Sequence, residues 1–173
     1  MFKKFIPFAH ENSIFEIDNC FFEKQGVKTL LIDLDNTLDS YKSKLPSERA
    51  KELIKRLRDA NINPIIISNN RGKRVSRYAK EINVDFVNSA GKPFPCRIKK
   101  ELARRSLNKD SVMLVGDQII TDVLAGRGAG IRVILTEKIV KEDQPTTHFN
   151  RLFDRPIRKY HRKHNNLKDW REL

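Results

Sequence analysis

Short, β-rich apolar runs alternate with segments of helical periodicity along this chain of 173 residues. Five strands are expected, at about 27–32, 64–67, 85–87, 111–115 and 132–135. Helices are expected between them, at about 47–60, 72–82, 96–106 and 123–129. Strands that alternate with helices form a parallel sheet with right-handed crossovers. The chain is therefore predicted to fold as a doubly wound parallel α/β sheet with helices on both faces.

Polar side chains follow four of these strands at the point where each strand ends. They are Asp33 and Asp35, then Ser68 and Asn69, then Lys92, and finally Asp117 with Asp122. In a doubly wound sheet the carboxyl ends of the strands converge on one crevice, where ligands bind. Acids beside a lysine and a hydroxyl group could hold a magnesium ion and an anionic phosphoryl group. The pattern predicts a phosphoryl-transfer site at this edge of the sheet.

Each part of this pattern has a simpler explanation when it is taken alone. The segment Asp33–Leu38 can be a turn rich in Asp and Asn, and Ser68-Asn69 can be another turn. Lys92 can be a solvated lysine, and Gly116-Asp117 can cap a helix. The occurrence of all four in this order favours one site over four unrelated local structures.

The chain is strongly basic, with 35 Lys and Arg against 22 Asp and Glu and a formal net charge of +13. Such a surplus favours phosphate-rich partners, such as nucleic acid or an anionic lipid surface. Residues 151–173 alone hold eight Lys and Arg against three Asp and Glu, with aromatic residues between them. The C-terminal extension, residues 148–173, can be a peripheral helix with a solvated face or a segment that binds a surface.

The cysteines and the opening residues indicate a compartment. Cys20 and Cys96 fit no zinc spacing and are expected to be free thiols in a reducing environment. No segment approaches the roughly 20 apolar residues that span a bilayer. Pro7 interrupts the apolar opening before a signal-peptide core is complete. We expect a cytoplasmic protein that could contact the inner face of the membrane peripherally.

One domain, residues 1–173, is expected, with a core at about 27–136. Only about eleven residues separate Leu38 from Ala50, and Ser68 follows soon after. This spacing leaves no room for a large cap domain, so the site is expected to be open. An open site suits a large substrate, or a headgroup at a membrane surface, better than a small metabolite that must be enclosed.

In its motifs the chain resembles the haloacid dehalogenase-like superfamily of magnesium-dependent phosphatases. The match consists of the DxDx[TV] motif at Asp33–Thr37, the strand-end residue Ser68, the lysine Lys92 and the GDxxxxD motif at Gly116–Asp122. The residues at these motif positions are similar to those of subfamily IIIA, YqeG-type. That branch is similar to the mitochondrial phosphatidylglycerophosphate phosphatases. Members often place a basic residue before the Lys-Pro pair, where this chain has Gly91.

The resemblance implies two catalytic residues. Asp33 would attack the phosphorus atom and form an aspartyl-phosphate, which splits hydrolysis into two easier steps. Asp35 would protonate the leaving oxygen and then accept a proton from the attacking water. The fold that the resemblance implies is a Rossmann-like core without a large cap.

The resemblance also implies the residues that bind the ion and the phosphate. Mg²⁺ would be held by the Asp33 carboxylate, the Asp35 backbone carbonyl and the Asp117 carboxylate. Asp122 would support that shell or act as a ligand through water. Ser68 and Lys92 would bind the phosphoryl group, and Asn69 would orient the phosphorylated substrate.

Three functions are open at this level. The first is a phosphatase for phosphatidylglycerophosphate that works at the cytosolic membrane face. The second is a soluble phosphatase of a sugar phosphate, a nucleotide or a phosphoprotein. The third is an RNA-associated or ribosome-associated factor whose basic surface provides the function. No RNA-recognition motif or aromatic stacking platform supports the third.

Overall fold

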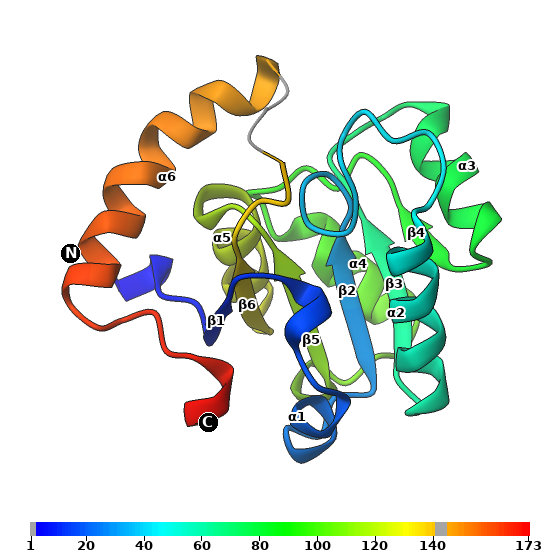
Figure 1. The fold of residues 1–173 in the computed structure, drawn as a ribbon, viewed down its shortest axis with the longest axis horizontal. Helices are drawn as coiled ribbons and strands as arrows, with labels where there is room; N and C mark the ends of the chain where they lie inside the picture. The colour runs from blue at the N-terminus through cyan, green and yellow to red at the C-terminus, as the bar shows by residue number, and fades with distance from the viewer. Residues whose placement is uncertain (1–2, 141–144) are drawn as a thin grey trace.

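The computed structural model describes residues 3–140 and 145–173, and the side chains of residues 145–151 lie outside that description. Met1, Phe2, Phe149 and Arg151, which belong to the terminal segments considered above, fall in these excluded parts. Six parallel strands form one sheet in the order β1-β6-β5-β2-β3-β4 (Figure 1). They are β1 (Ala9–Glu11), β2 (Thr29–Asp33), β3 (Asn63–Ile67), β4 (Asp85–Val87), β5 (Val112–Gly116) and β6 (Arg132–Thr136). The predicted doubly wound α/β fold is confirmed.

The helices of the described chain are α1 (Asn19–Lys24), α2 (Glu48–Asp59), α3 (Lys73–Glu81), α4 (Cys96–Arg104), α5 (Leu124–Ala129) and α6 (Pro145–Lys163). Four of them, α2 to α5, lie at the predicted places, α6 forms in the C-terminal extension, and α1 is not among the predicted helices. Short 3-10 turns are η1 (Lys3–Phe5), η2 (Ile14–Glu16), η3 (Lys109–Ser111) and η5 (Trp170–Glu172), and η4 (Ile119–Val123) is a π-helical turn. None of the described helices is both long and apolar enough to cross a membrane. Cys20 and Cys96 are exposed free thiols, as predicted.

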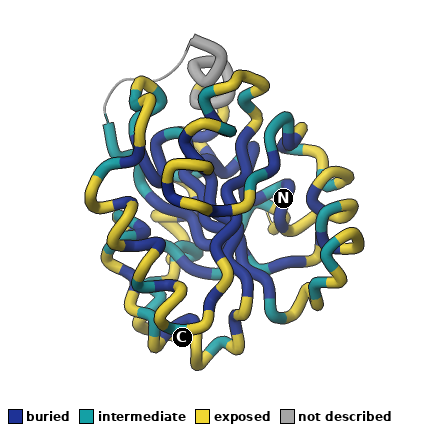
Figure 2. Tube along the Cα trace, turned by 90° about the vertical axis from the view of Figure 1, so that its right-hand side faces the viewer, coloured by how far each residue is buried: buried dark blue, intermediate teal, exposed yellow. Residues whose placement is uncertain are grey.

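Helices cover both faces of the sheet because successive strand residues point to opposite sides. Leu30 and Ile32 of β2 pack in a cluster with residues of α1, α2 and α3. Leu31, between them, packs in a second cluster with residues of α4 and α5. Figure 2 shows the buried strands at the centre and helices that are exposed only on their outer sides. Strands covered in this way account for the continuous apolar runs in the sequence.

The order of the strands places the switch point of the sheet between β2 and β5. The chain proceeds from β2 to β3 and β4 on one side, and β5 and β6 lie on the other side. Ligands in such sheets bind at this switch point, outside the carboxyl ends of the strands. Asp33 is the last residue of β2, and Asp117 follows β5 directly. In the described part of the chain, α3 is the one helix between β3 and β4, and no cap domain is inserted.

The edge strand β1 is absent from the sequence-based prediction. It has only three residues, of which His10 and Glu11 are polar, so it shows no alternating pattern. Its register pairs Ala9 with Ile134 of β6. The C-terminal tail supports it, because Trp170 Nε1 donates a 2.6 Å hydrogen bond to the buried Glu11 carboxylate. Long-range contacts of this kind, rather than local propensity, form the strand.

Glu137, the residue after β6, links β1 to α6 through ion pairs. Its Oε1 atom lies 2.9 Å from His10 Nε2, 2.8 Å from Arg158 Nη1 and 2.6 Å from Arg162 Nη2. Burial raises the pKa of Glu137, but the hydrogen bond from His10 and the charges of the two arginines lower it more, to about 2. The ionised carboxylate is therefore part of what attaches α6 to the sheet.

Replacement of the Glu137 carboxylate should make the free energy of unfolding less dependent on pH in the acid range. A lowered folded-state pKa stabilises the protein above the unfolded-state value of about 4.3, and this contribution is lost as the pH falls from there towards 2. Glu137→Gln should cost about 1–2 kcal/mol at pH 7 once solvent screening is considered. The difference from the wild type should shrink below pH 4.3. Urea unfolding of both proteins at several pH values measures this difference in unfolding free energy.

Glu48→Gln is the matched control, because the Glu48 side chain is 83% exposed and pairs only with a neighbour on its own helix. That change should move the unfolding free energy by less than about 0.5 kcal/mol at every pH. A Glu137→Gln deficit that stays constant down to pH 3 would contradict the assigned ion-pair role.

Candidate active site

Lys92 lies at the centre of a buried charged cluster at the carboxyl edge of the sheet. Its Nζ atom donates hydrogen bonds of 2.6 Å to Asp33 Oδ1 and 2.6 Å to Asp122 Oδ1, and a longer one of 3.5 Å to the Ile67 carbonyl oxygen. The side chains of Lys92, Asp33 and Asp122 are 2%, 9% and 1% exposed. Three predicted residues from different strand ends therefore meet in one place.

Asn69, which lies just after β3, fixes the backbone of Lys92. Its Nδ2 atom donates to the Lys92 carbonyl oxygen at 2.8 Å, and its Oδ1 atom accepts from the Lys92 N–H at 2.8 Å. The preceding residue, Gly91, has a φ of 69°, a conformation that glycine adopts without strain. Asn69 thus positions the lysine in this structure, and its predicted contact with the substrate stays a prediction.

Burial and charge act in opposite directions on the two central groups. Burial lowers the pKa of Lys92, but the Asp122 and Asp33 charges raise it more, so Lys92 stays an ammonium ion. Burial also raises the pKa of Asp33. Lys92 lowers that pKa, and the charges of Asp122 and Asp117 raise it again, so it lies well above the usual range. One lysine does not offset this many buried acids, and the site favours a further cation.

The loop after β5 carries the Gly116–Asp122 motif and turns back through η4. Asp122 Oδ2 accepts hydrogen bonds from the Gln118 N–H at 3.1 Å and from the hydroxyl of the residue before it at 3.3 Å. The Asp122 carboxyl group lies against Gly116, where any Cβ atom would overlap with it. This close approach explains the glycine. Because both Asp122 oxygens accept protein hydrogen bonds, the contacts favour support of the metal shell over direct ligation.

Asp35 is held by an ion pair with Arg74, a residue that the motif pattern does not single out. Arg74 Nη2 donates to Asp35 Oδ1, and Arg74 Nη1 donates to the Ser43 carbonyl oxygen at 2.9 Å. The Ser68 hydroxyl lies 3.5 Å from Asp35 Oδ2. The groups predicted to transfer a proton and to bind phosphate are therefore neighbours, and Arg74 fixes the Asp35 carboxylate.

A sequence signal for Arg74 exists at the start of α3. Arg71, Lys73 and Arg74 are all basic, and the first turn of α3 holds no acidic residue. A helix N-terminus favours negative charge, so basic residues there oppose the helix dipole. Such a placement indicates that at least one of them faces an anionic group elsewhere in the fold.

The charges at this edge fit a hard divalent cation such as Mg²⁺. The carboxylates of Asp33, Asp35, Asp117 and Asp122 face two cationic side chains of the described chain, Lys92 and Arg74. When all four are ionised, they outnumber the ammonium and guanidinium groups that contact Asp33, Asp35 and Asp122. The described residues contain no group of three His, Cys, Asp or Glu side chains that could hold an ion unaided. Mg²⁺ needs only one or two carboxylates and keeps several waters, so Asp33 and Asp117 are a sufficient pair.

Two buried polar atoms of the motif loops fit the same conclusion. Thr37 Oγ1 and Gln118 Oε1 are buried and have no hydrogen-bond partner among the described residues. Buried polar atoms are nearly always satisfied by protein or by ordered water. Thr37 belongs to the loop of Asp33, and Gln118 follows Asp117, so both belong to loops that carry candidate ligands.

The predicted site residues all come to this edge of the sheet. They are Asp33, Asp35, Ser68, Asn69, Lys92, Asp117 and Asp122. Their catalytic and ligand roles stay predictions.

Known proteins with similar sequences define the family. A HAD-hydrolase-like family model matches residues 89–153. The chain is 31% identical over 158 residues to a Bacillus subtilis (strain 168) protein named probable phosphatase YqeG, a match that covers 91% of this chain and 92% of that protein. The chain therefore belongs to the haloacid dehalogenase-like hydrolases, in the branch that contains YqeG. These relatives indicate a phosphatase and confirm the resemblance seen in the motifs.

Solved structures share the fold at lower identity. One is a 3-deoxy-D-manno-octulosonate 8-phosphate phosphatase from Yersinia pestis, with 16% identity, a TM-score of 0.50, and coverage of 70% of this chain and 78% of that chain. Another is an uncharacterized protein from Listeria monocytogenes serotype 4b, with 16% identity, a TM-score of 0.55, and coverage of 69% and 85%. This likeness shows the fold and leaves the substrate open.

Removal of the central lysine should destabilise the fold. Lys92→Met leaves Asp33 and Asp122 buried without their cation, and the loss of one partner of a buried pair costs about 3–5 kcal/mol. Urea unfolding in a chelating, magnesium-free buffer measures the cost. Lys55→Met is the control, because Lys55 is 80% exposed and should contribute less than about 0.5 kcal/mol. Equal stability of the two variants would contradict the assigned charge balance.

Proposed function

We propose that the protein is a magnesium-dependent phosphomonoester phosphatase that works through an aspartyl-phosphate, with phosphatidylglycerophosphate as its leading substrate. The observation that carries the chemistry is the buried contact of Lys92 with Asp33 and Asp122, with Asp117 beside them. A phosphoryl group that approaches Asp33 meets this ammonium group, which stabilises charge on the transferring oxygens. Membership of the haloacid dehalogenase-like hydrolases supports the same reaction.

The reaction consists of two displacements at phosphorus. In the first, an oxygen of Asp33 bonds to phosphorus, the ester P–O bond breaks, and Asp35 gives a proton to the leaving oxygen. In the second, water bonds to phosphorus and gives a proton to Asp35, and the bond between phosphorus and Asp33 breaks. Ser68 and Lys92 donate hydrogen bonds to the phosphoryl oxygens in both. Arg74 pairs with the Asp35 carboxylate in the structure, so Asp35 must take up a proton from solvent before it acts as the acid in the first displacement.

Asp33 and Asp117, with the backbone carbonyl of Asp35, would hold the magnesium ion. When bound, Mg²⁺ supplies positive charge that offsets the carboxylates and orients the phosphate for in-line attack. The fit rests on the surplus of negative charge described above and on the hard oxygen donors at these positions.

A lipid substrate is supported by exposed apolar side chains on loops that follow β2 and β4 and on α6. Leu45 on the loop after β2, Phe94 on the loop after β4, and Leu152 and Phe153 on α6 are all exposed. They are accompanied by exposed basic residues, among them Lys42, Lys44, Arg97 and Lys100. Apolar side chains beside Lys and Arg are typical of a surface that binds anionic lipid headgroups. In this proposal the protein is cytoplasmic and contacts the inner face of the membrane peripherally, with its active site turned towards it.

Replacement of the nucleophile should abolish turnover. Asp33→Asn should lower phosphate release from every substrate by at least about 10³-fold, because the first displacement requires an ionised oxygen. A panel of phosphatidylglycerophosphate in vesicles, sugar phosphates, nucleotides and phosphopeptides, each with and without Mg²⁺, measures this and ranks the substrates. Asp59→Asn, at a carboxylate that is 66% exposed on α2, should match the wild type. Turnover by Asp33→Asn above one-tenth of wild type would contradict the mechanism.

The lipid part of the proposal has its own test. The double change Leu45→Ser and Phe94→Ser should lower turnover of the lipid in vesicles by about tenfold and leave turnover of a soluble ester within about twofold, since only surface binding is lost. Leu173→Ser, at an exposed leucine of the C-terminal tail, is the control. Equal losses on both substrates, or none on vesicles, would contradict membrane contact at the site. Salt-sensitive RNA binding that survives Asp33→Asn would favour the nucleic-acid function instead.

A further inference from the structure

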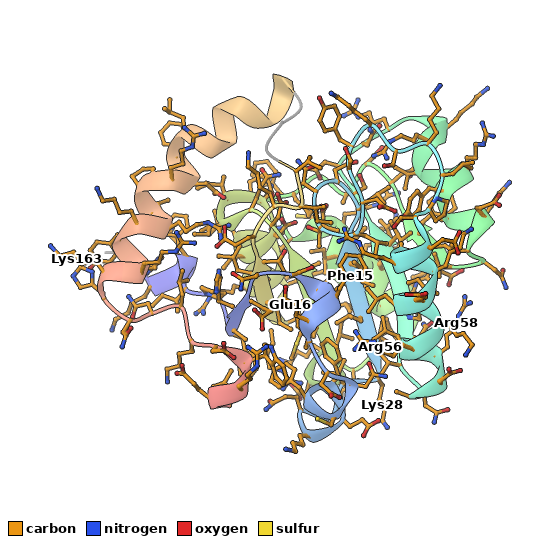
Figure 3. All side chains as sticks on the ribbon, viewed as in Figure 1. Phe15, Glu16, Lys28, Arg56, Arg58 and Lys163 are labelled. Atoms are coloured by element: carbon orange, nitrogen blue, oxygen red, sulfur yellow. The ribbon has the colours of Figure 1, made fainter. Side chains whose placement is uncertain are left out.

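Helix α6 packs on the fold through a face that is mainly polar. In Figure 1 it lies outside the α/β layers, on the side of β1 and β6, and in Figure 3 Lys163 at its end projects away from the fold. Asp154, Ile157 and His161 are its buried residues among the described side chains, spaced as on one face of a helix. Ile157 is the one apolar residue of these three. Burial of one such residue stabilises by about 1.5–3 kcal/mol, and the buried polar residues beside it add hydrogen bonds to the attachment.

The Asp154 carboxylate, 2% exposed, binds the turn that follows the candidate metal ligand Asp117. Its Oδ2 atom accepts a hydrogen bond from the Ile119 N–H at 2.9 Å, and its Oδ1 atom accepts one from the Ile120 N–H at 2.8 Å. These amides open the π-helical turn η4, and the first N–H groups of a helical turn lack partners within it. A carboxylate supplied from a distant helix thus fixes the start of the turn.

Arg158, one helical turn further along α6, binds the same loop at its first residue. Arg158 Nη2 donates a 2.8 Å hydrogen bond to the carbonyl oxygen of Asp117, and Arg158 Nη1 donates one of 2.8 Å to Glu137 Oε1. The guanidinium group therefore connects the backbone of a candidate metal ligand to the end of β6. Its planar fork suits two such acceptors at once.

We propose that Asp154 and Arg158 are positioning residues that orient the Asp117 carboxylate for cation binding. The loop is held at Asp117 by Arg158, at its middle by Asp154, and at Asp122 by Lys92. Neither α6 residue reaches the reacting atoms, so each acts through the backbone of the loop. Partners that orient a metal ligand commonly alter metal affinity by 10–100-fold when they are removed. The inference rests on the proposed magnesium site.

The test measures loop protection and cation affinity without any substrate. Asp154→Asn keeps the shape of the side chain but replaces one of its two acceptors with an NH₂ group, which cannot accept from an amide. Amide hydrogen exchange of the peptide that contains Ile119 and Ile120 should become faster. The dissociation constant for Mn²⁺, used as a paramagnetic probe in place of Mg²⁺ and read by electron spin resonance, should rise by about 10–100-fold.

A matched pair of arginine changes on α6 provides the control. Arg158→Lys should weaken Mn²⁺ binding by about tenfold or more, because lysine lacks the planar guanidinium group that bonds to two acceptors at once. Arg155→Lys, at an exposed position, should leave the Mn²⁺ affinity unchanged. Circular dichroism and melting curves verify that each variant is folded. If Asp154→Asn does not fold, Arg158→Lys alone decides the outcome.

Two results would overturn the inference. One is unchanged Mn²⁺ affinity in the folded Asp154→Asn and Arg158→Lys variants, with or without faster exchange. The other is a wild-type protein that binds no Mn²⁺. If the wild type binds Mn²⁺ and the variants bind it more weakly, but no phosphate ester is hydrolysed, the proposed function fails and the positioning role of α6 stands.

Discussion

Buried carboxylates at the edge of a parallel sheet stay ionised only beside a cation, and this constraint sets the arrangement of the active site. Lys92 meets it in part, through two short contacts to the carboxylates of Asp33 and Asp122, and the raised pKa of Asp33 shows that a further cation is favoured. Much of the surrounding structure keeps the lysine and its partners in place. Asn69 binds the lysine backbone, and the absence of a side chain at Gly116 lets Asp122 approach. A costly element of the fold, an ammonium group out of water, is thus also the element that an anionic substrate would meet.

The attachment of α6 follows from the same loop. Among its described side chains α6 buries one apolar residue, Ile157, and its polar groups bind the rest of the fold at several points. Asp154 finds two unpaired amides, and Arg158 finds the carbonyl of Asp117. Glu137 connects α6 to β1, because it binds Arg158 and Arg162 of the helix and His10 of the strand. The edge strand, the peripheral helix and the loop of the candidate metal ligand therefore form one connected set of ionic and hydrogen-bonded contacts.

The sequence predicts the strands around the site well because their signal is local. β2, β3 and β5 are apolar runs that end in polar residues, and the rule that strand ends converge brings those residues together. What the sequence does not show depends on distant partners. β1 is too short for periodicity, and Asp154 resembles any acid on a basic helix until its two amide partners are known. Arg74 is an intermediate case, since its position at a helix N-terminus is unusual while its partner Asp35 is visible only in the structure.

The protein as a whole and its site carry opposite charges, and this contrast orders the events in the proposed reaction. A net charge of +13 attracts anionic substrates and anionic surfaces over a distance of about 8–10 Å at physiological salt. Within the site four carboxylates lie near one another, and Lys92 and Arg74 pair with three of them. A phosphate drawn to the surface is repelled at the last step unless a cation already lies at Asp33 and Asp117. Binding of the cation should therefore precede productive binding of the phosphate, and the contacts that orient Asp117 act before the substrate arrives.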